Sequence, residues 1–323
     1  MPGRGWDDHW RSSTEKSGQY SNFGPLWHAA AEQLSLITGR IALPCSSGTS
    51  AIAVAAALAD TICWDDCVVD PRYEAFTFAA TSLAAKQVNA FYRPIRTDAA
   101  VPDASSVIRT VPFGMQREFS AHKQDVLIID AAGAFGIDAL QRYPECAIIT
   151  CSFHATKNFP IGEGGCVFLP AGWERQAKLA RAAMNFGMNE ERKFERSLCW
   201  AGNAKLDELH CALLLAQLEG ADYFAARSVR IAEDSKILAS TITGASLPYS
   251  TGKWQSMVVV EHPFPDALCS RLIAGGFMAR RMYHPFVDPE LLSYEESHLV
   301  ALPSDMVQEE LEQLVECANV GPL

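Results

Sequence analysis

One stretch of the chain decides its fold: CSFHATKNFPIGEGG, at residues 151–165. Apolar runs reach this stretch from both sides, at residues 147–151 and 166–169. Unbroken apolar runs of this kind are typical of strands buried on both faces of a mainly parallel sheet. Most lysines are solvated surface charges. Lys157 instead follows one buried strand and precedes a glycine-rich loop into the next, where an enclosed amine can act as a Schiff-base nucleophile.

Outward from this stretch, predicted strands alternate with predicted helices. The strands are expected at 41–44, 67–70, 107–111 and 126–129, and the helices at 25–38, 48–60 and 77–85. This alternation predicts an α/β fold, with a mainly parallel sheet flanked by helices. The first 20 or so residues are polar and glycine-rich and are expected to form a loose arm.

The second part of the chain begins with the strongest helical pattern, at residues 205–226. Shorter elements follow it: strands at 257–260 and 278–283, and helices at 266–274 and 305–317. Asp305, with Gln308 three residues later, resembles a capping box. We therefore expect a large domain over residues 1–225 and a small α+β domain over 226–323.

Composition excludes several classes of protein. The formal net charge of −11 argues against a nucleic-acid partner, which would need a basic face. The ten cysteines lack zinc-site spacing, so we expect free thiols and no metal. The N-terminus has no apolar signal region, and no apolar run is long enough to span a bilayer. These patterns predict a cytoplasmic globular protein that does not bind membranes.

Two further motifs place polar groups beside predicted strands. The turn SSGTS at residues 46–50 opens an apolar helix. Its free N–H groups and the helix dipole favour a phosphate, although an ordinary N-cap is the alternative. Asp130 ends the apolar run 126–129. It lies where α/β proteins bind ligands, and it suits a pyridinium nitrogen; a structural aspartate that caps the next turn is the alternative.

Taken together, these motifs resemble the DegT/StrS group of sugar aminotransferases, which are enzymes of fold type I that depend on pyridoxal 5'-phosphate. SFHATKN at 152–158, followed by GEGG at 162–165, is the most specific part of the resemblance. It continues through most of the chain, in YSNFGPL at 20–26, SGTS at 47–50, FTF at 76–78, MNFG at 184–187, GN at 202–203, YHP at 283–285 and LP at 302–303.

The resemblance implies a role for each matching residue. Lys157 carries the cofactor, Asp130 pairs with the pyridine nitrogen, and Phe78 stacks on the ring, with Phe76 as the less favoured stacker. The cofactor phosphate is expected to contact Gly48, Thr49, Ser50 and Ser152. Asn203 would reach the phosphate of a neighbouring subunit, which implies a homodimer with shared active sites; an N-cap before the helix at 205–226 is its ordinary alternative. The candidates for substrate contact are His154, Lys205, Tyr283 and His284.

Three features depart from the family pattern. Gly133 stands where the family has a glutamine that touches the cofactor ring oxygen. Lys205 stands where the family often has an arginine, and lysine cannot reproduce a bidentate arginine contact. The C-terminal unit is also short for the group. A sister branch of deoxysugar dehydratases has histidine in place of the lysine, so Lys157 argues against that branch.

The expected activity is ping-pong transamination from an amino donor, glutamate, to a nucleotide-linked keto sugar. Lys157 would act as the general acid and base for the proton shift, and Asp130 would keep the ring nitrogen charged. Some relatives use other carbonyl acceptors. A regulator or sensor that binds the cofactor without turnover is the alternative from a different class, and intact Lys157 and Asp130 favour the enzyme.

Overall fold

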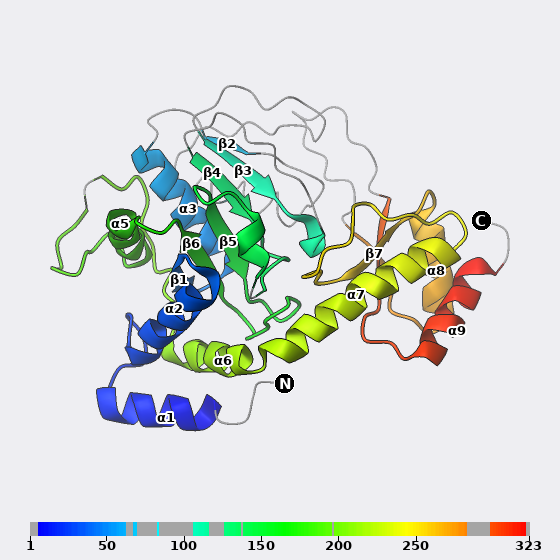
Figure 1. Ribbon diagram of the computed structural model, residues 1–323, viewed down its shortest axis with the longest axis horizontal. Helices are drawn as coiled ribbons and strands as arrows, with labels where there is room; N and C mark the ends of the chain where they lie inside the picture. Colours follow the sequence, from blue (N-terminus) through cyan, green and yellow to red (C-terminus); the bar gives the residue numbers. More distant parts are fainter. Residues whose placement is uncertain are drawn as a thin grey trace.

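The computed structural model describes residues 6–62, 67–69, 83, 106–115, 126–136, 138–195, 197–282 and 298–320. Within them, a larger unit is built on a six-stranded sheet and a smaller one on a three-stranded sheet (Figure 1). The long helix α7, Ala221–Thr241, runs from the first unit to the second. The predicted α/β fold class is thereby confirmed.

The large sheet is mainly parallel. Its strands, in spatial order, are β1 (Ile41–Cys45), β6 (Gly165–Leu169), β5 (Ile148–Ser152), β4 (Val126–Asp130), β3 (Ser106–Thr110) and β2 (Cys67–Val69). Strands β2 to β5 lie parallel to one another, whereas β6 is antiparallel to both of its neighbours, β5 and β1. All six predicted strands are confirmed, with bounds that differ by one or two residues.

Helices cover the sheet because its central strands are apolar on both faces. Every residue of β3, β5 and β6 is buried. Helix α3, Gly48–Ile62, packs on β4, β5 and β6 and is itself buried from Ala51 to Ala59. Its small alanine side chains let α5, Glu174–Met184, pack behind it. Helix α2, Pro25–Thr38, has its predicted bounds and packs on β1.

Two local expectations about the large unit are wrong. The N-terminal arm is helical over α1, Trp6–Ser17, which packs on α2 and α6. The helix expected at 205–226 is split into α6, Glu208–Glu219, and α7, with Gly220 between them. Asp207, whose side chain accepts a hydrogen bond from the His210 N–H, caps α6. Asn203 is therefore not the cap of this helix.

Short 3-10 turns occupy Pro112–Gly114 and Ala139–Arg142. The helix expected at 77–85 lies outside the described residues, apart from residue 83.

A buried carboxylate joins α6 to α2. Glu208 is the first residue of α6 and is fully buried. Its Oε2 accepts the Leu26 N–H at 2.8 Å, and its Oε1 accepts the Trp27 N–H at 2.9 Å. These N–H groups belong to the first turn of α2, which has no side-chain cap of its own. Glu208 therefore satisfies two donors that the helix cannot pair, and its charge complements the helix dipole.

We expect Glu208→Gln to lower the free energy of unfolding by about 2–4 kcal/mol, because an amide can accept only one of the two N–H groups and its own NH₂ faces the other. Urea unfolding followed by tryptophan fluorescence measures the change. Glu32→Gln, on the exposed side of α2, is the matched control. Equal stability of the two variants would show that Glu208 does not anchor α2.

The smaller unit is antiparallel. Its sheet has the order β7 (Val258–Glu261), β9 (Leu299–Leu302) and β8 (Arg280–Arg281). Strand β9 was not predicted, and only two residues of the strand expected at 278–283 are described as a strand. Helices α7, α8 (Pro265–Ala274) and α9 (Gln308–Asn319) pack around this sheet.

The main buried cluster of the large unit is separate from that of the small unit. Phe224 of α7 packs into the large core, whereas Ile231 and Leu238 of the same helix pack into the small one. The domain boundary near residue 225 remains a proposal, and this division of the buried side chains of α7 supports it. None of the described helices is long and apolar enough to cross a bilayer.

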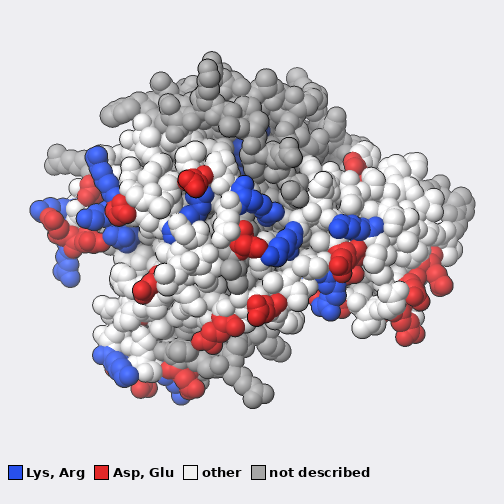
Figure 2. Space-filling model, viewed as in Figure 1, with Lys and Arg blue, Asp and Glu red and all other residues white. Residues whose placement is uncertain are grey.

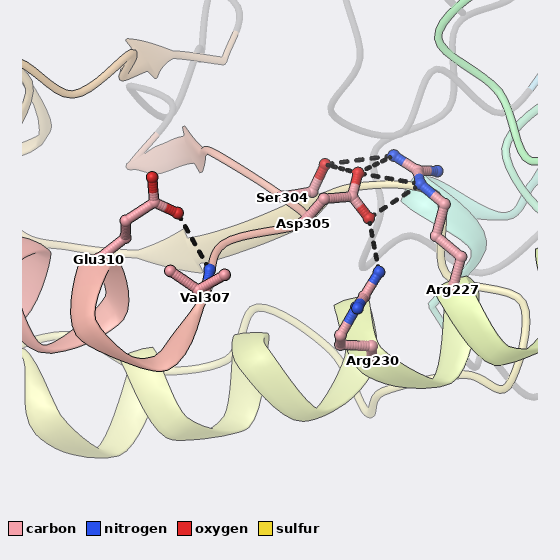
Figure 3. A network of polar contacts seen from close by, with 6 residues as sticks. All are labelled: Arg227, Arg230, Ser304, Asp305, Val307 and Glu310. Carbon is pink, nitrogen blue, oxygen red and sulfur yellow. Dashed lines mark hydrogen bonds and ion pairs between the residues drawn. The ribbon is translucent and has the colours of Figure 1, made fainter. Parts of the chain in front are cut away.

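The capping box expected at Asp305 and Gln308 is wrong. The Glu310 carboxylate accepts the Val307 N–H at 3.0 Å instead, two residues further along the chain. Asp305 adopts a left-handed backbone conformation, with φ of 65°. Its carboxylate binds two arginines of α7, Arg227 at 2.8 Å and Arg230 at 3.2 Å (Figure 3). The Asp305 side chain therefore forms ion pairs with α7 and does not cap the helix that follows it.

Charged side chains of both signs are interspersed on the face shown in Figure 2. Lysine and arginine lie beside aspartate and glutamate over both units, rather than in separate fields.

Candidate active site

One cavity brings together most of the predicted site residues that the structure describes. Its volume is about 380 Å³, and it lies at the carboxyl ends of β4 and β5, beside the first turn of α3. Parallel α/β sheets bind their ligands at this edge. The predicted residues that line the cavity are Gly48, Thr49, Asp130, Ser152, His154 and Lys157.

The loop that carries Lys157 is a tight connection between β5 and β6. The Lys157 N–H donates to the His154 carbonyl at 2.8 Å, and the Ala155 N–H donates to the Gly162 carbonyl at 2.9 Å. The next residue, Asn158, is buried and donates from Nδ2 to the Trp254 carbonyl at 2.7 Å. Lys157 is therefore fixed at its backbone, while its side chain lines the cavity.

Asp130 places a buried carboxylate in the same cavity. It is the last residue of β4, and its Oδ1 accepts the Ala132 N–H at 3.0 Å. Burial raises the pKa of Asp130 to about 6, against the opposing effects of the Ala132 N–H and of Lys157. An ionised carboxylate in this position gains from a cationic partner. A protonated ring nitrogen of a bound cofactor is such a partner.

The first turn of α3 forms a pocket for an anion. Ser47 caps the helix, because its Oγ accepts the Ser50 N–H at 3.1 Å. The N–H groups of Gly48 and Thr49 come first in the helix, where no helical carbonyl can pair with them. A Cβ at Gly48 would lie 2.9 Å from Cβ of Ser152, so a side chain there would close the pocket. This turn therefore presents donors to a phosphate.

Ser50 does not line the cavity. Its hydroxyl lies 3.0 Å from the Oγ atoms of both Ser46 and Ser47. Ser47, which was not among the predicted site residues, lines the cavity instead.

The glycine at 133 is explained by packing. A Cβ at this position would lie 3.0 Å from Oγ of Ser256 and 3.3 Å from the Gly114 nitrogen. Ser256 is fixed there, since its N–H donates to the Phe113 carbonyl at 2.8 Å. A side chain at position 133 therefore requires Oγ of Ser256 and the backbone at Gly114 to shift by a few tenths of an ångström.

His154 lines the cavity beside Glu163. Its Nδ1 lies 3.1 Å from Oγ1 of Thr156, and its Nε2 lies 3.7 Å from Oε1 of Glu163. Both partners also line the cavity. His154 is thus placed where it can contact a substrate.

Asn203 and Lys205 lie apart from this cavity. Asn203 is exposed and forms a backbone bridge with Asn185. The Lys205 ammonium donates to Oδ1 of Asn185 at 2.9 Å and lies 4.6 Å from the centre of the Phe186 ring. Burial lowers the pKa of Lys205. Four other predicted site residues, Phe76, Phe78, Tyr283 and His284, lie outside the described residues.

The C-terminal unit and its linker supply a wall of the cavity that sequence reasoning missed. This wall consists of Ser256, Met257, Arg280 and Met282. They lie 99 to 125 residues beyond Lys157 in the sequence and belong to no local motif. Glu163 belongs to the GEGG stretch at 162–165, but nothing in the sequence distinguished it as a site residue.

Within the described residues, no cluster of histidine, cysteine, aspartate or glutamate could hold a metal ion, and the eight cysteines with described side chains are free thiols.

A family model matches this chain. The model of the DegT/DnrJ/EryC1/StrS aminotransferase family covers residues 109–298, which is more than half of the chain and includes Asp130 and Lys157. The chain belongs to this family. The predicted resemblance is thereby confirmed.

Comparisons with individual members agree. The dTDP-4-amino-4,6-dideoxy-D-glucose transaminase of Shigella dysenteriae is 30% identical over 180 residues, which is 52% of this chain and 47% of that protein. The match thus spans about half the length of this relative. A DegT/DnrJ/EryC1/StrS aminotransferase from Brucella abortus has a TM-score of 0.78 and 18% identity, over 97% of this chain and 94% of that one. DesI, solved in the presence of its TDP-sugar product, has a TM-score of 0.77 and 20% identity, over 99% and 91%. The two solved structures establish the shared fold.

Proposed function

We propose that this chain is an aminotransferase that depends on pyridoxal phosphate and moves an amino group, by a ping-pong mechanism, from glutamate to a nucleotide-linked keto sugar. One observation carries the proposal: an amine, a buried carboxylate and an anion pocket, at Lys157, Asp130 and Gly48, line one cavity. These three features fit the aldehyde, the ring nitrogen and the phosphate of pyridoxal phosphate.

Each residue has a defined task in this proposal. When bound, pyridoxal phosphate supplies an electron sink for negative charge on the substrate carbon. Lys157 would hold the cofactor through its amine, and the same amine, when free, would take the proton from the donor carbon that carries the amino group. Asp130 keeps the proton on the ring nitrogen. The N–H groups of Gly48 and Thr49 and the hydroxyl of Ser152 hold the phosphate.

The proposed acceptor rests on the relatives. The Shigella transaminase is named for a dTDP-linked amino sugar, and DesI was solved with a TDP-sugar product. We propose the same chemical class of acceptor for this chain.

Two spectroscopic steps test the function. Glutamate added to the cofactor-loaded protein should remove the yellow absorbance as the cofactor takes up the amino group. Keto-sugar nucleotides, added one at a time to this aminated form, should restore the absorbance when the correct acceptor is present. A protein that binds the cofactor without turnover would keep its yellow band with every amino acid tried, and that result would refute the proposal.

We also propose a homodimer with shared sites. Asn203 is exposed and lies away from the cavity of its own chain, so its amide is available to the cavity of a second copy. Because Asp207 caps the nearby helix, Asn203 is not needed for that task.

Asn203→Ala should weaken cofactor affinity about tenfold, as expected for one hydrogen bond to a charged phosphate. The melting temperature of the cofactor-free protein should change little. Mixing Asn203→Ala subunits with Lys157→Ala subunits should restore activity, at a cofactor concentration where neither parent is active, because one site of each mixed dimer has both wild-type residues. Proven subunit exchange without recovered activity would contradict shared sites.

A further inference from the structure

Arg280 brings a second cationic side chain to the cavity that contains Lys157. It lies on β8, which pairs with β9 so that Arg280 faces Ala301 and Arg281 faces Val300. Successive side chains of a strand point to opposite faces of the sheet. Accordingly, Arg281 binds Asp266 of α8 at 2.8 Å, whereas Arg280 lines the cavity. Two adjacent arginines are thus separated into one ion-paired cation and one that faces the candidate site.

The guanidinium of Arg280 has no hydrogen bond or ion pair within the described parts of the chain. The two carboxylates of the cavity wall, Asp130 and Glu163, already have other partners. Asp130 accepts the Ala132 N–H, and Glu163 lies 3.7 Å from His154. An exposed arginine that lines a cavity is suited to an anion that enters from solution.

The proposed cofactor does not use this position. Its phosphate is accounted for by the first turn of α3 and by Ser152, both in the large unit. Arg280 belongs to the wall that the small unit supplies, together with Met257 and Met282. The cation is therefore available to a substrate.

We propose that Arg280 binds a carboxylate of the amino donor. This inference rests on the proposed function. A donor amino acid carries a carboxylate on the same carbon as its reacting amine, so the anion must lie in the cavity that contains Lys157. The phosphates of a nucleotide-linked acceptor lie beyond a sugar ring from its reacting carbonyl. The planar guanidinium also matches a carboxylate through two parallel hydrogen bonds. Arg280 thus sets the preference for a donor with a carboxylate beside the amine.

Binding without turnover tests this assignment. Glutarate, a dicarboxylate without an amine, is titrated calorimetrically into the cofactor-loaded protein. Arg280→Gln should weaken glutarate binding about 10- to 100-fold, the range expected when a charge-assisted bidentate contact is lost. The affinity of Arg280→Lys for glutarate should lie between those of the wild type and of Arg280→Gln, because lysine keeps the positive charge but cannot form two parallel hydrogen bonds. Arg281→Gln, which removes the same charge from the opposite face of β8, should bind glutarate like the wild type.

A second titration, with a nucleoside diphosphate, separates the two sources of anion. The affinity for the nucleoside diphosphate should be the same in Arg280→Gln as in the wild type. In turnover assays of Arg280→Gln, the KM for glutamate should rise while the KM for the acceptor stays constant. The inference is overturned if Arg280→Gln weakens the binding of the nucleoside diphosphate instead of the binding of glutarate. It is also overturned if Arg281→Gln weakens glutarate binding as much as Arg280→Gln does, or if the wild type does not bind glutarate. Failure of the proposed function looks different, since glutamate would then leave the yellow absorbance unchanged in every variant, including the wild type.

Discussion

Replacing Lys157 with alanine should lower amino-group transfer by about 10⁴-fold or more, because the residue both holds the cofactor and moves the proton. The fold should persist, since the backbone of the loop is held by hydrogen bonds that do not involve the lysine side chain. Circular dichroism and the melting temperature of the cofactor-free protein check the fold, and glutamate-dependent loss of the yellow absorbance checks the chemistry.

Chemical labelling tests the same residue directly. Borohydride reduction of the wild-type protein loaded with pyridoxal phosphate should leave a pyridoxyl group on the peptide that contains Lys157. Lys236→Ala, which removes an exposed lysine of α7, should label and react like the wild type. A pyridoxyl group found on another lysine of the wild-type protein would refute the assignment.

Asp130→Asn should separate activity from stability. The amide keeps the shape of the side chain and can still accept the Ala132 N–H, but it loses the charge that holds a proton on the ring nitrogen. We expect transamination to fall on the order of 10³-fold, with the loss in the proton-transfer step and with cofactor still bound. Near-normal turnover would show that Asp130 is only structural. Asp222→Asn, on the exposed side of α7, is the control.

The same variant should make the cofactor-free protein more stable. Burial raises the pKa of Asp130 from 3.8 to about 6, so the folded state binds this proton more tightly than the unfolded state does. The carboxyl therefore destabilises the fold progressively as the pH rises from about 4 to about 6, and by a constant amount above that range. At pH 7.5, Asp130→Asn should raise the free energy of unfolding by about 2–3 kcal/mol.

Urea unfolding of both proteins at several pH values measures this difference. The gap between Asp130→Asn and the wild type should close as the pH falls from 6 to 4, because both side chains are then neutral. A gap that stays constant over this range would mean that the effect comes from packing rather than from the buried charge.

The sequence predicted the large unit well, because its signals are local. Strands buried on both faces must be apolar throughout, so β3 to β6 could be located to within a residue or two. The cavity could be predicted for the same reason. Asp130 and Ser152 end adjacent strands of one sheet, and the carboxyl ends of β4 and β5 meet at one edge.

The errors occur where distant residues decide the local structure. Helix α1 is polar and forms because it packs on α2 and α6, which its own composition does not reveal. Asp305 precedes a helix, as a cap would, but two arginines of α7 bind its carboxylate. Ser256 and Arg280 reach the cavity only through the packing of the small unit, so no spacing in the sequence could have identified them.

The position of Trp254 limits how this molecule could be divided. Its carbonyl accepts a hydrogen bond from Asn158, beside Lys157, and its ring lies so close to Gly136 that a Cβ there would come within 1.8 Å of it. Two residues later, Ser256 lines the cavity. The pocket is therefore a joint product of both parts of the polypeptide. A gene cut anywhere along α7 would yield two fragments, neither of which contains the complete cavity. An exchange of C-terminal modules between family members would therefore have to preserve these contacts of Trp254 and Ser256.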